Sequence, residues 1–522
     1  MRPEKLSDAI GNIDGNMIAE AEKAPASKSK RYFLPIAAAA ACVCLVLGGV
    51  FAALGNRAPV EGGAQDSSTP SSSLSESSGE SVPSEDSGAH SEVSQAESSG
   101  ESSSPVSVTA GAPAAIVEAV YPERKLLGST EWWDDLNYLR QQMMDTAPDL
   151  NSFYSATVKS MLTGSAGENR VYSPLNIYIA LGMLSELTDG NSRAQLLDLL
   201  GVKDIAQLRQ NIGALWNYNY ILDGSTVSVL ANSLWLRDDM GYRQPTLDLL
   251  AEKYYATSYH GEMGTEEYDQ MLRNWINAQT GDLLTDQTGG LSLPQDTTLG
   301  LVSTISFSSG WADPFDSEKN TVETFHSPTG DVDCDFMHQT VLTEYYVGDS
   351  FTAAPLSLGV YRHSMMFILP NEGVSVDDVL ASDELVSLLC SGTSRNHYGY
   401  AFVDFSTPKF DVVSDIDLSA GLKAIGVTDV FDSSVSDFSP LTDPFEGLSV
   451  SQAQHAARVS IDENGCVAVA YSAITVGAGG EEAINAALTL DRPFIFAITV
   501  PTFLPDGSIS NTLLFVGVVN MP

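Results

Sequence analysis

Residues 58–112 cannot bury enough apolar surface to fold, and this segment limits where a folded domain can begin. It consists almost entirely of Ser, Glu, Gly and Pro, as in STPSSSLSESSGESVPSEDSG, and it holds nine acidic and no basic residues. Such side chains cannot offset the entropy lost on ordering, so we predict a disordered stalk over 56–112. About 54 residues of flexible chain span roughly 40 Å, and charge repulsion extends them further. A linker without an evolved length is the alternative.

An uncharged apolar run precedes this stalk. Tyr32–Leu54 would measure about 34 Å as a helix, enough to cross a hydrocarbon core of about 30 Å. Three basic residues lie just before it and only Arg57 follows it, which places the N-terminus in the cytoplasm. We predict a cytoplasmic tail over 1–31, a transmembrane signal-anchor helix over 32–55 and an extracellular domain over 113–522, in a single-pass protein of the cell membrane. A cleaved signal peptide, with an unusually long basic region, is the alternative.

The chain is strongly acidic, with a formal net charge of -41. Residues 1–112 hold 14 of the 67 acidic and 7 of the 26 basic residues, so the rest of the chain holds 53 and 19, a net of -34. Such a surface repels phosphate backbones, which excludes nucleic acid as a partner. Three cysteines lie beyond the apolar run without metal-binding spacing, so they predict no disulfide framework, although one bridge between two of them stays open.

From about residue 113 the composition is that of a globular domain. Apolar residues at helical spacing predict helices over 149–164, 172–187 and 191–201. The second begins with Ser173 as a cap and Pro174 at its first position, and it should be buried because apolar residues occupy nearly every side. Helices cluster early and strands late, which predicts an α+β fold with a large mixed or antiparallel sheet. The expected strands are 225–237, 298–309, 363–370, 447–462, 492–501 and 511–520.

The sequence lacks the common enzyme motifs. It contains no G-x-S-x-G, H-E-x-x-H, P-loop or G-x-G-x-x-G, and its seven histidines are scattered. We therefore expect no catalytic residues, no metal and no cofactor, and we favour binding or inhibition over catalysis. A hydrolase with an unrecognised triad is the remaining enzyme alternative.

Six segments in a characteristic order resemble the serpin family of serine protease inhibitors. The resemblance covers roughly residues 145–522, and we identify the chain as resembling a bacterial, membrane-anchored member. It implies an α+β serpin fold with large mixed β-sheets, about eight or nine helices and an exposed reactive-centre loop, in a monomer. The segments are NRVYSPLNIYIALGML (169–184), RNWINAQTGDLL (273–284), STISFSSGWADPFD (303–316), SMMFILP (364–370), HAARVSIDENGCVAVA (455–470) and the C-terminal run from RPFIFAI to LLFVGVVNMP.

The resemblance implies a suicide mechanism. A serine protease, or in some cases a cysteine protease, attacks the exposed loop, and the cut loop then inserts as a new strand in the main sheet and carries the trapped protease with it. A serpin-fold protein that does not inhibit and only binds at the cell surface is the alternative. The hinge that the resemblance implies consists of Glu463, Asn464, Gly465, Cys466, Ala468 and Ala470.

The loop sequence suits insertion on physical grounds. A strand inside a sheet buries one face, so alternate side chains have to be small or apolar. Tyr471 belongs to the other alternating set, where it can stand outward, and no Pro and no charge interrupts 466–476. The set that suits the buried face is Cys466, Ala468, Ala470, Ser472, Ile474 and Val476.

The family's spacing from the hinge implies a window for the reactive bond. The window holds no Lys or Arg, which argues against trypsin-like proteases, whose pocket requires a cation. Its small residues favour elastase-like or subtilisin-like proteases, whereas its glutamates would suit a glutamate-specific one. The window residues are Ala478, Gly479, Gly480, Glu481 and Glu482.

The resemblance also implies a hydrogen-bonded cluster where the sheet opens. Family members usually place two Ser, one Asn and one His there; at the matching positions here, the second Ser is Asn and the Asn is Ser. The exchange keeps the set of donors and acceptors, and we expect His455 to bond to a side chain of another member. Another departure is at the hinge, where Cys replaces the usual Thr or Ser. The cluster residues are Ser173, Asn176, Ser303 and His455, together with Trp311.

Overall fold

A computed structural model describes residues 106–107, 112–165, 167–360, 363–391, 398–443, 448–451, 453–466, 484–504 and 508–522. The predicted cytoplasmic tail, membrane helix and most of the stalk lie outside these residues, as does the loop over 467–483. Within the described ranges, no helix is long and apolar enough to cross a membrane. The end of the predicted stalk is not wholly unstructured, because Val106–Ser107 forms a strand, β1, that pairs with β6 (Gly241–Tyr242).

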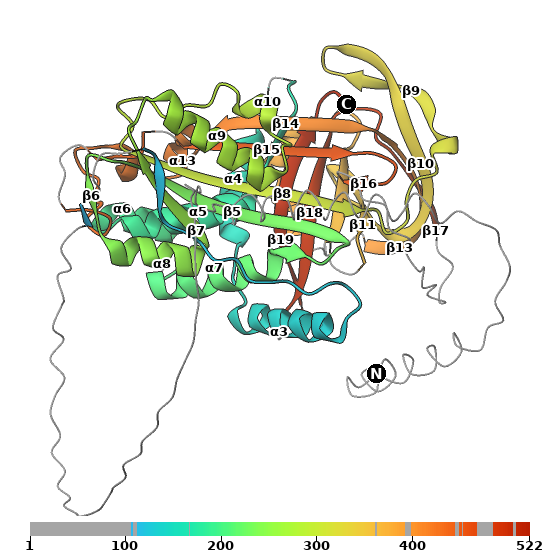
Figure 1. Cartoon of the computed structure of the whole chain (residues 1–522). Helices are drawn as coiled ribbons and strands as arrows, with labels where there is room; N and C mark the ends of the chain where they lie inside the picture. Colours follow the sequence, from blue (N-terminus) through green and yellow to red (C-terminus); the bar gives the residue numbers. More distant parts are fainter. Residues whose placement is uncertain are drawn as a thin grey trace, which may run out of the picture. The chain divides into compact units, whose positions relative to one another are not determined.

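The first of two large sheets has nine strands (Figure 1). All its pairings are antiparallel except that of β13 with β17, so the sheet is mixed. Its order is β17 (Ile484–Thr489), β13 (Tyr398–Pro408), β10 (Gly330–Val347), β11 (Phe351–Leu358), β12 (His363–Pro370), β18 (Phe494–Phe503), β19 (Ile509–Val519) and β3 (Arg170–Tyr172), with β9 (Thr321–Ser327) on β10.

The second sheet has eight strands and contains the hinge region. It is also mixed, because β5 and β7 run parallel. Its order is β14 (Phe410–Asp417), β15 (Gln454–Ile461), β16 (Gly465–Cys466), β8 (Leu299–Gly310), β5 (Thr226–Arg237), β7 (Ala256–Gly261) and β2 (Ala114–Val117), with β4 (Ile221–Leu222) on β5.

Eight helices of nine or more residues lie in the described ranges, which agrees with the expected eight or nine. Three shorter helices accompany them: α10 (Thr285–Thr288), α11 (Val376–Leu380) and α13 (Leu418–Ala424). The eight longer ones are α3 (Thr130–Thr146), α4 (Asn151–Leu162), α5 (Pro174–Leu187), α6 (Gly190–Leu199), α7 (Ile205–Asn219), α8 (Gln244–Tyr254), α9 (Glu266–Thr280) and α12 (Asp383–Ser391).

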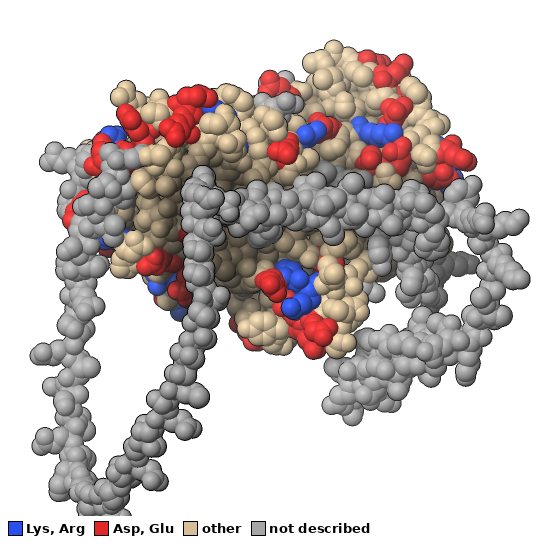
Figure 2. Space-filling model, in the orientation of Figure 1, with Lys and Arg blue, Asp and Glu red and all other residues tan. Residues whose placement is uncertain are grey.

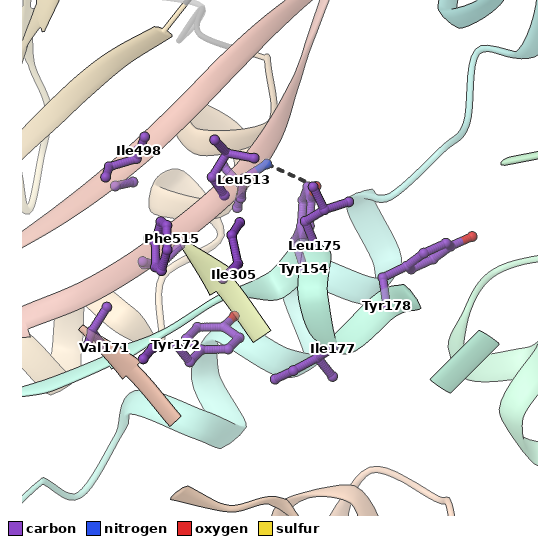
Figure 3. Close-up of a cluster of buried hydrophobic side chains, with 14 of the residues drawn as sticks. Tyr154, Val171, Tyr172, Leu175, Ile177, Tyr178, Ile305, Ile498, Leu513 and Phe515 are labelled. Carbon is purple, nitrogen blue, oxygen red and sulfur yellow. Dashed lines mark hydrogen bonds between the residues drawn. The ribbon is translucent and has the colours of Figure 1, made fainter. Parts of the chain in front are cut away.

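Helix α5 forms the platform behind the second sheet. Ser173 caps it, since its side chain accepts a hydrogen bond from the Asn176 N–H, and Pro174 stands at its start, as the sequence predicts. All its residues except Ala180 are buried, and it contacts both β8 and β19. Figure 3 shows the core around its N-terminal half, where the Tyr154 hydroxyl accepts a hydrogen bond of 3.0 Å from the Leu513 N–H. The sheet therefore rests on a densely packed, largely apolar support.

The expected strands are present, with one boundary corrected. The strand predicted over 447–462 begins only at Gln454. Its predicted first part includes residues that bond to short helices, since the Val450 N–H donates to the Val430 carbonyl in a 3-10 turn and the Leu418 N–H, at the start of α13, donates to the Ala453 carbonyl. Figure 2 shows one face of the molecule, on which Asp and Glu side chains are more prominent than Lys and Arg.

Candidate functional site

The second sheet has an open position between β15 and β8. Only β16 stands between them in the strand order, and it pairs Cys466 with Ile461 on one side and with Ser309 on the other. It contributes two residue pairs to β8, whereas β5 on the opposite edge contributes eleven. Among the described residues, no strand pairs with this edge of β8 beyond Ser309. A hinge strand is thus seated at the entrance of a sheet position that the described chain does not fill.

The turn before β16 is held by its own acidic side chain. Asp462 Oδ1 accepts hydrogen bonds from the N–H groups of Asn464 (2.7 Å) and Gly465 (3.2 Å). Gly465 is required by close approach, because a Cβ there would lie 2.4 Å from the Ser309 carbonyl oxygen and 2.6 Å from the Gly310 Cα. The hinge therefore enters the sheet through a contact that only glycine permits.

Trp311 fixes this turn rather than the polar cluster to which the sequence analysis assigned it. Its ring is buried and its Nε1 donates to the Asp462 carbonyl at 2.8 Å, while its main-chain N–H donates to Asn464 O at 2.8 Å. The next turn of chain adds a bond from the Phe315 N–H to Glu463 O at 2.9 Å. The carbonyls of three consecutive residues, Asp462 to Asn464, thus accept hydrogen bonds from the segment Trp311–Phe315.

Glu463 links the hinge to the connection between β13 and β14. Lys409 Nζ lies 2.7 Å from its carboxylate, and Asn320 Nδ2 donates to the same oxygen at 2.5 Å. Partial burial favours the neutral acid, but the Lys409 and Asn320 hydrogen bonds outweigh it and hold the pKa of Glu463 below its ordinary value. The same hydrogen bond to Glu463 raises the pKa of Lys409. The pair is therefore charged at neutral pH.

Cys466 is the last described residue of the hinge. Its side chain is buried, and burial raises the pKa of its thiol to about 12, so it packs as a small apolar group. The remaining hinge residues, Ala468 and Ala470, lie outside the described residues, and so do Ala478, Gly479, Gly480, Glu481 and Glu482. Across the described ranges, no three His, Cys, Asp or Glu side chains gather in a way that could hold a metal ion.

The polar cluster contains a member that the sequence analysis missed. Ser303 Oγ lies 2.5 Å from Asn176 Oδ1 and 2.7 Å from Asn232 Oδ1. A hydroxyl has one proton, so the network is consistent when the Asn176 amide is turned and its nitrogen donates to Ser303. Asn232 also donates to the Tyr254 carbonyl at 2.9 Å. Asn232 could have been noticed in the sequence, because it is an amide within a run of mostly apolar and small residues, STVSVLANSLWLR.

His455 is buried but has a different partner from the one expected. Its Nε2 accepts a hydrogen bond of 3.0 Å from the main-chain N–H of Ser173. The expected bond to a cluster side chain is wrong because the Ser173 hydroxyl caps α5 and Ser303 is bound to the two asparagines. Burial lowers the pKa of His455 to about 4, so the imidazole is neutral and its accepting nitrogen ties β15 to α5.

Comparisons with known proteins agree with this geometry. The family model described as serpin (serine protease inhibitor) matches residues 149–522. A serpin-like protein of Thermococcus kodakarensis is 27% identical over 385 residues, covering 71% of this chain and 85% of the relative. Plasminogen activator inhibitor 1 of Mus musculus is 26% identical over 395 residues, covering 72% and 92%.

Solved structures show the same fold. The thermophilic serpin tengpin in its native state matches with a TM-score of 0.63 and 21% identity, covering 79% of this chain and all of that one. The mouse protein-Z dependent protease inhibitor matches with a TM-score of 0.59 and 18% identity, covering 76% and 100%.

Proposed function

This chain belongs to the serpin family, whose members are protease inhibitors and not enzymes, and from that premise we propose that it traps serine endopeptidases by inserting its cut loop into the second sheet. The loop over 467–483 supplies the bait, and β16 supplies the point from which insertion starts. Proteases with shallow pockets, elastase-like or subtilisin-like, are the proposed targets because the window over 478–482 contains no cation.

The observation that carries this proposal is the pairing of β16 with both β15 and β8. Cys466 already pairs with both neighbours that an inserted strand would have, Ile461 on β15 and Ser309 on β8. The strand would lengthen in the same register, and β15 and β8, which contact each other, would separate to admit it. Successive added residues would form main-chain hydrogen bonds alternately to β15 and to β8, which makes insertion strongly favourable once the loop is cut.

Incubation of the full-length protein with a panel of active serine proteases, followed by denaturing electrophoresis, tests the proposal. We expect a denaturant-resistant complex with an elastase-like or subtilisin-like enzyme, and none with the same enzyme after its active-site serine is blocked. Ala470→Arg is the matched variant, since this position would face the buried side between Ala457 and Ile305. A buried charge should turn the inhibitor into a substrate. Cleavage of the parent without any complex would contradict inhibition and leave the binding-only alternative.

We further propose that the protein is displayed outside the cell. The support is the sequence of residues 32–55, which suits a membrane span, followed by a polar stalk over 56–112. Membrane fractionation of cells that express the full-length chain, with external protease added to intact cells, tests the topology. Protection of the inhibitor domain from external protease would overturn the proposed orientation.

A further inference from the structure

The second sheet carries a cleft of about 420 Å³ at its β14 edge, and we propose that this cleft binds the zwitterion of a small α-amino acid. It is lined by β14, by the start of β3 and the residues before it, by α13 and by the last turn of α4. Its volume suits a small molecule. Among its described lining residues, none belongs to the hinge or to the polar cluster, so the proposal goes beyond the proposed function.

Arg170 is the basic group of this cleft, and it has no carboxylate partner among the described residues. Of the ten arginines that the structure describes, all form ion pairs except Arg140 and Arg170. The hydrogen bond that the Arg170 side chain makes is long, 3.4 Å from Nη1 to the Thr163 carbonyl. Most of the five N–H donors of its guanidinium are therefore available to an anion.

Three carboxylates line the same cleft, those of Glu168, Asp415 and Asp417, and in the described part of the chain no ion pair joins any of them to Arg170. Asp415 and Asp417 are two residues apart on β14 and so project from the same face of the strand. Partial burial raises the pKa of Asp415, which means that its charged form would gain from a nearby cation. Opposite charges thus face one cleft without touching, and a ligand that carries both charges can bridge them.

Ser414 adds a hydroxyl donor to the cleft. Its side chain is only 7% exposed, and its Oγ accepts a hydrogen bond of 2.8 Å from the Val171 N–H. The hydroxyl proton itself has no acceptor among the residues that the structure describes. Val171 directly follows Arg170, so this bond holds Ser414 close to the arginine. A carboxylate in the cleft could therefore accept hydrogen bonds from both side chains.

The two charged ends of an α-amino acid match these two groups of side chains. Its carboxylate would accept hydrogen bonds from Arg170 and Ser414. Its ammonium group would donate to Asp415 and Asp417 on β14. The two α13 residues in the cleft are alanine and glycine, which leaves space for a short apolar side chain on the ligand. We therefore expect alanine or valine to bind, whereas an anion alone would be repelled by the three carboxylates.

Titration calorimetry of the full-length protein with L-alanine, at constant ionic strength, tests the assignment. Acetate and ethylamine carry one charge each, and we expect them to bind more weakly than alanine by roughly tenfold or more. Arg170→Gln should weaken alanine binding by about the same factor. Arg140→Gln is the matched control, because it removes the other arginine without an ion pair, on α3 and outside the cleft, and it should leave binding unchanged.

The melting temperature separates a loss of binding from a loss of folding. Alanine at roughly 100 times its dissociation constant should raise the melting temperature of the parent and of Arg140→Gln, but not that of Arg170→Gln. Should Arg170→Gln fail to fold, Asp415→Asn tests the other end of the site, since it should weaken alanine binding and leave acetate binding no weaker.

Three results would overturn the proposal: no binding of alanine to the folded parent, acetate binding as tightly as alanine, or alanine binding equally to the parent and to the folded cleft variants. None of them would affect the proposed protease inhibition, because the formation of a protease complex is measured separately and does not require this cleft.

Discussion

The two edges of β8 differ in how many of their residues pair with a neighbouring strand. Along one edge, eleven residues pair with β5, from Ser309 to Leu299. Along the other edge, β16 supplies two residue pairs, and beyond them β15 contacts β8 but no described strand pairs with it. Both edges belong to one twelve-residue strand, so the difference does not come from the β-propensity of β8 itself. It comes from what the rest of the chain places beside it.

The contrast shows where the protein can change and where it cannot. The β5 edge is supported by buried aromatic side chains such as Trp235, which stacks on Tyr259 of β7. The open edge is held by a few polar links, namely His455 with Ser173 and Ser303 with Asn176. Each of these hydrogen bonds contributes little on its own. Replacing them by hydrogen bonds to new partners therefore costs less free energy than disrupting a packed core.

Cutting the loop should produce the largest effect, because a filled open edge would resemble the β5 edge. The strand from Cys466 to Val476 would add on the order of ten main-chain hydrogen bonds at about 1 kcal/mol each, opposed by the entropy of ordering. We expect the melting temperature to rise by roughly 10 °C or more, measured by calorimetry before and after clean nicking. An unchanged melting temperature would show that the two edges stay different after cleavage.

Acidification should weaken the open edge next. The pKa of folded His455, about 4, lies below the value of about 6.5 of an unfolded histidine. Between these values the unfolded chain binds more protons, so the stability is complete above about pH 6.5 and declines by about 3 kcal/mol as the pH falls to 4.

His455→Gln tests this pH dependence. The variant cannot take up the proton, so its melting temperature should change less between pH 7 and pH 5 than that of the parent, and at pH 7 it should polymerise at lower temperature. His326→Gln removes an exposed histidine of β9 and serves as the control. Equal pH profiles for the parent and His455→Gln would rule out this role.

Gly465→Ala should disrupt the pairing of β16 with β8. Its Cβ would overlap the Ser309 carbonyl and the Gly310 Cα, at a cost of about 1–3 kcal/mol. We expect a lower melting temperature and slower formation of the protease complex. Gly213→Ala in α7 is the control, since a Cβ there meets no atom within 4 Å and alanine favours the helix. If Gly465→Ala matches the parent in both measurements, the close approach of residue 465 to β8 does not require glycine.

Reversing the charge of Glu463 should have the smallest effect of these changes. Glu463→Lys places two cations together at the hinge, where the side chain is only 17% exposed, and we expect a loss of about 1–2 kcal/mol. The double change Glu463→Lys with Lys409→Glu should recover part of it in chemical denaturation. Glu252→Lys beside Lys253 on the surface should change stability by less than about 0.5 kcal/mol. Equal losses in the free energy of unfolding at the two sites would show that the Glu463–Lys409 pair stabilises the protein no more than an exposed ion pair.

Much of the fold was predictable because it follows from local patterns. Ser173 and Pro174 start α5 through capping chemistry that needs only neighbouring residues, and the β-branched and aromatic residues in the apolar runs of β8, β12 and β19 favour strands. The alternation from Cys466 to Val476 could likewise be read directly, and the inward orientation of Cys466 agrees with it.

The contacts of single side chains were not predictable, because they depend on residues far apart in the chain. The Ser173 hydroxyl was already committed to its helix, and this left His455 to bond to the main chain. Asn232 joined the cluster because β5 and β8 pair at that level, with Asn232 opposite Ser303. Trp311 bonds to the turn before β16 and not to the cluster, because the sheet brings it beside Asp462, 151 residues later in the chain.

The sequence by itself determined that this chain holds a folded domain after a polar segment rich in Ser and Glu, that α5 is a buried helix, and that residues 466–476 carry a strand pattern without charge. Only the tertiary structure decided that β16 is seated between β15 and β8 and that Arg170 and Asp415 line one cleft. The physical reason is that hydrophobic periodicity and capping act over a few residues. Whether one edge of a strand stays unpaired depends on which other strands lie beside it, and these strands come from distant parts of the chain.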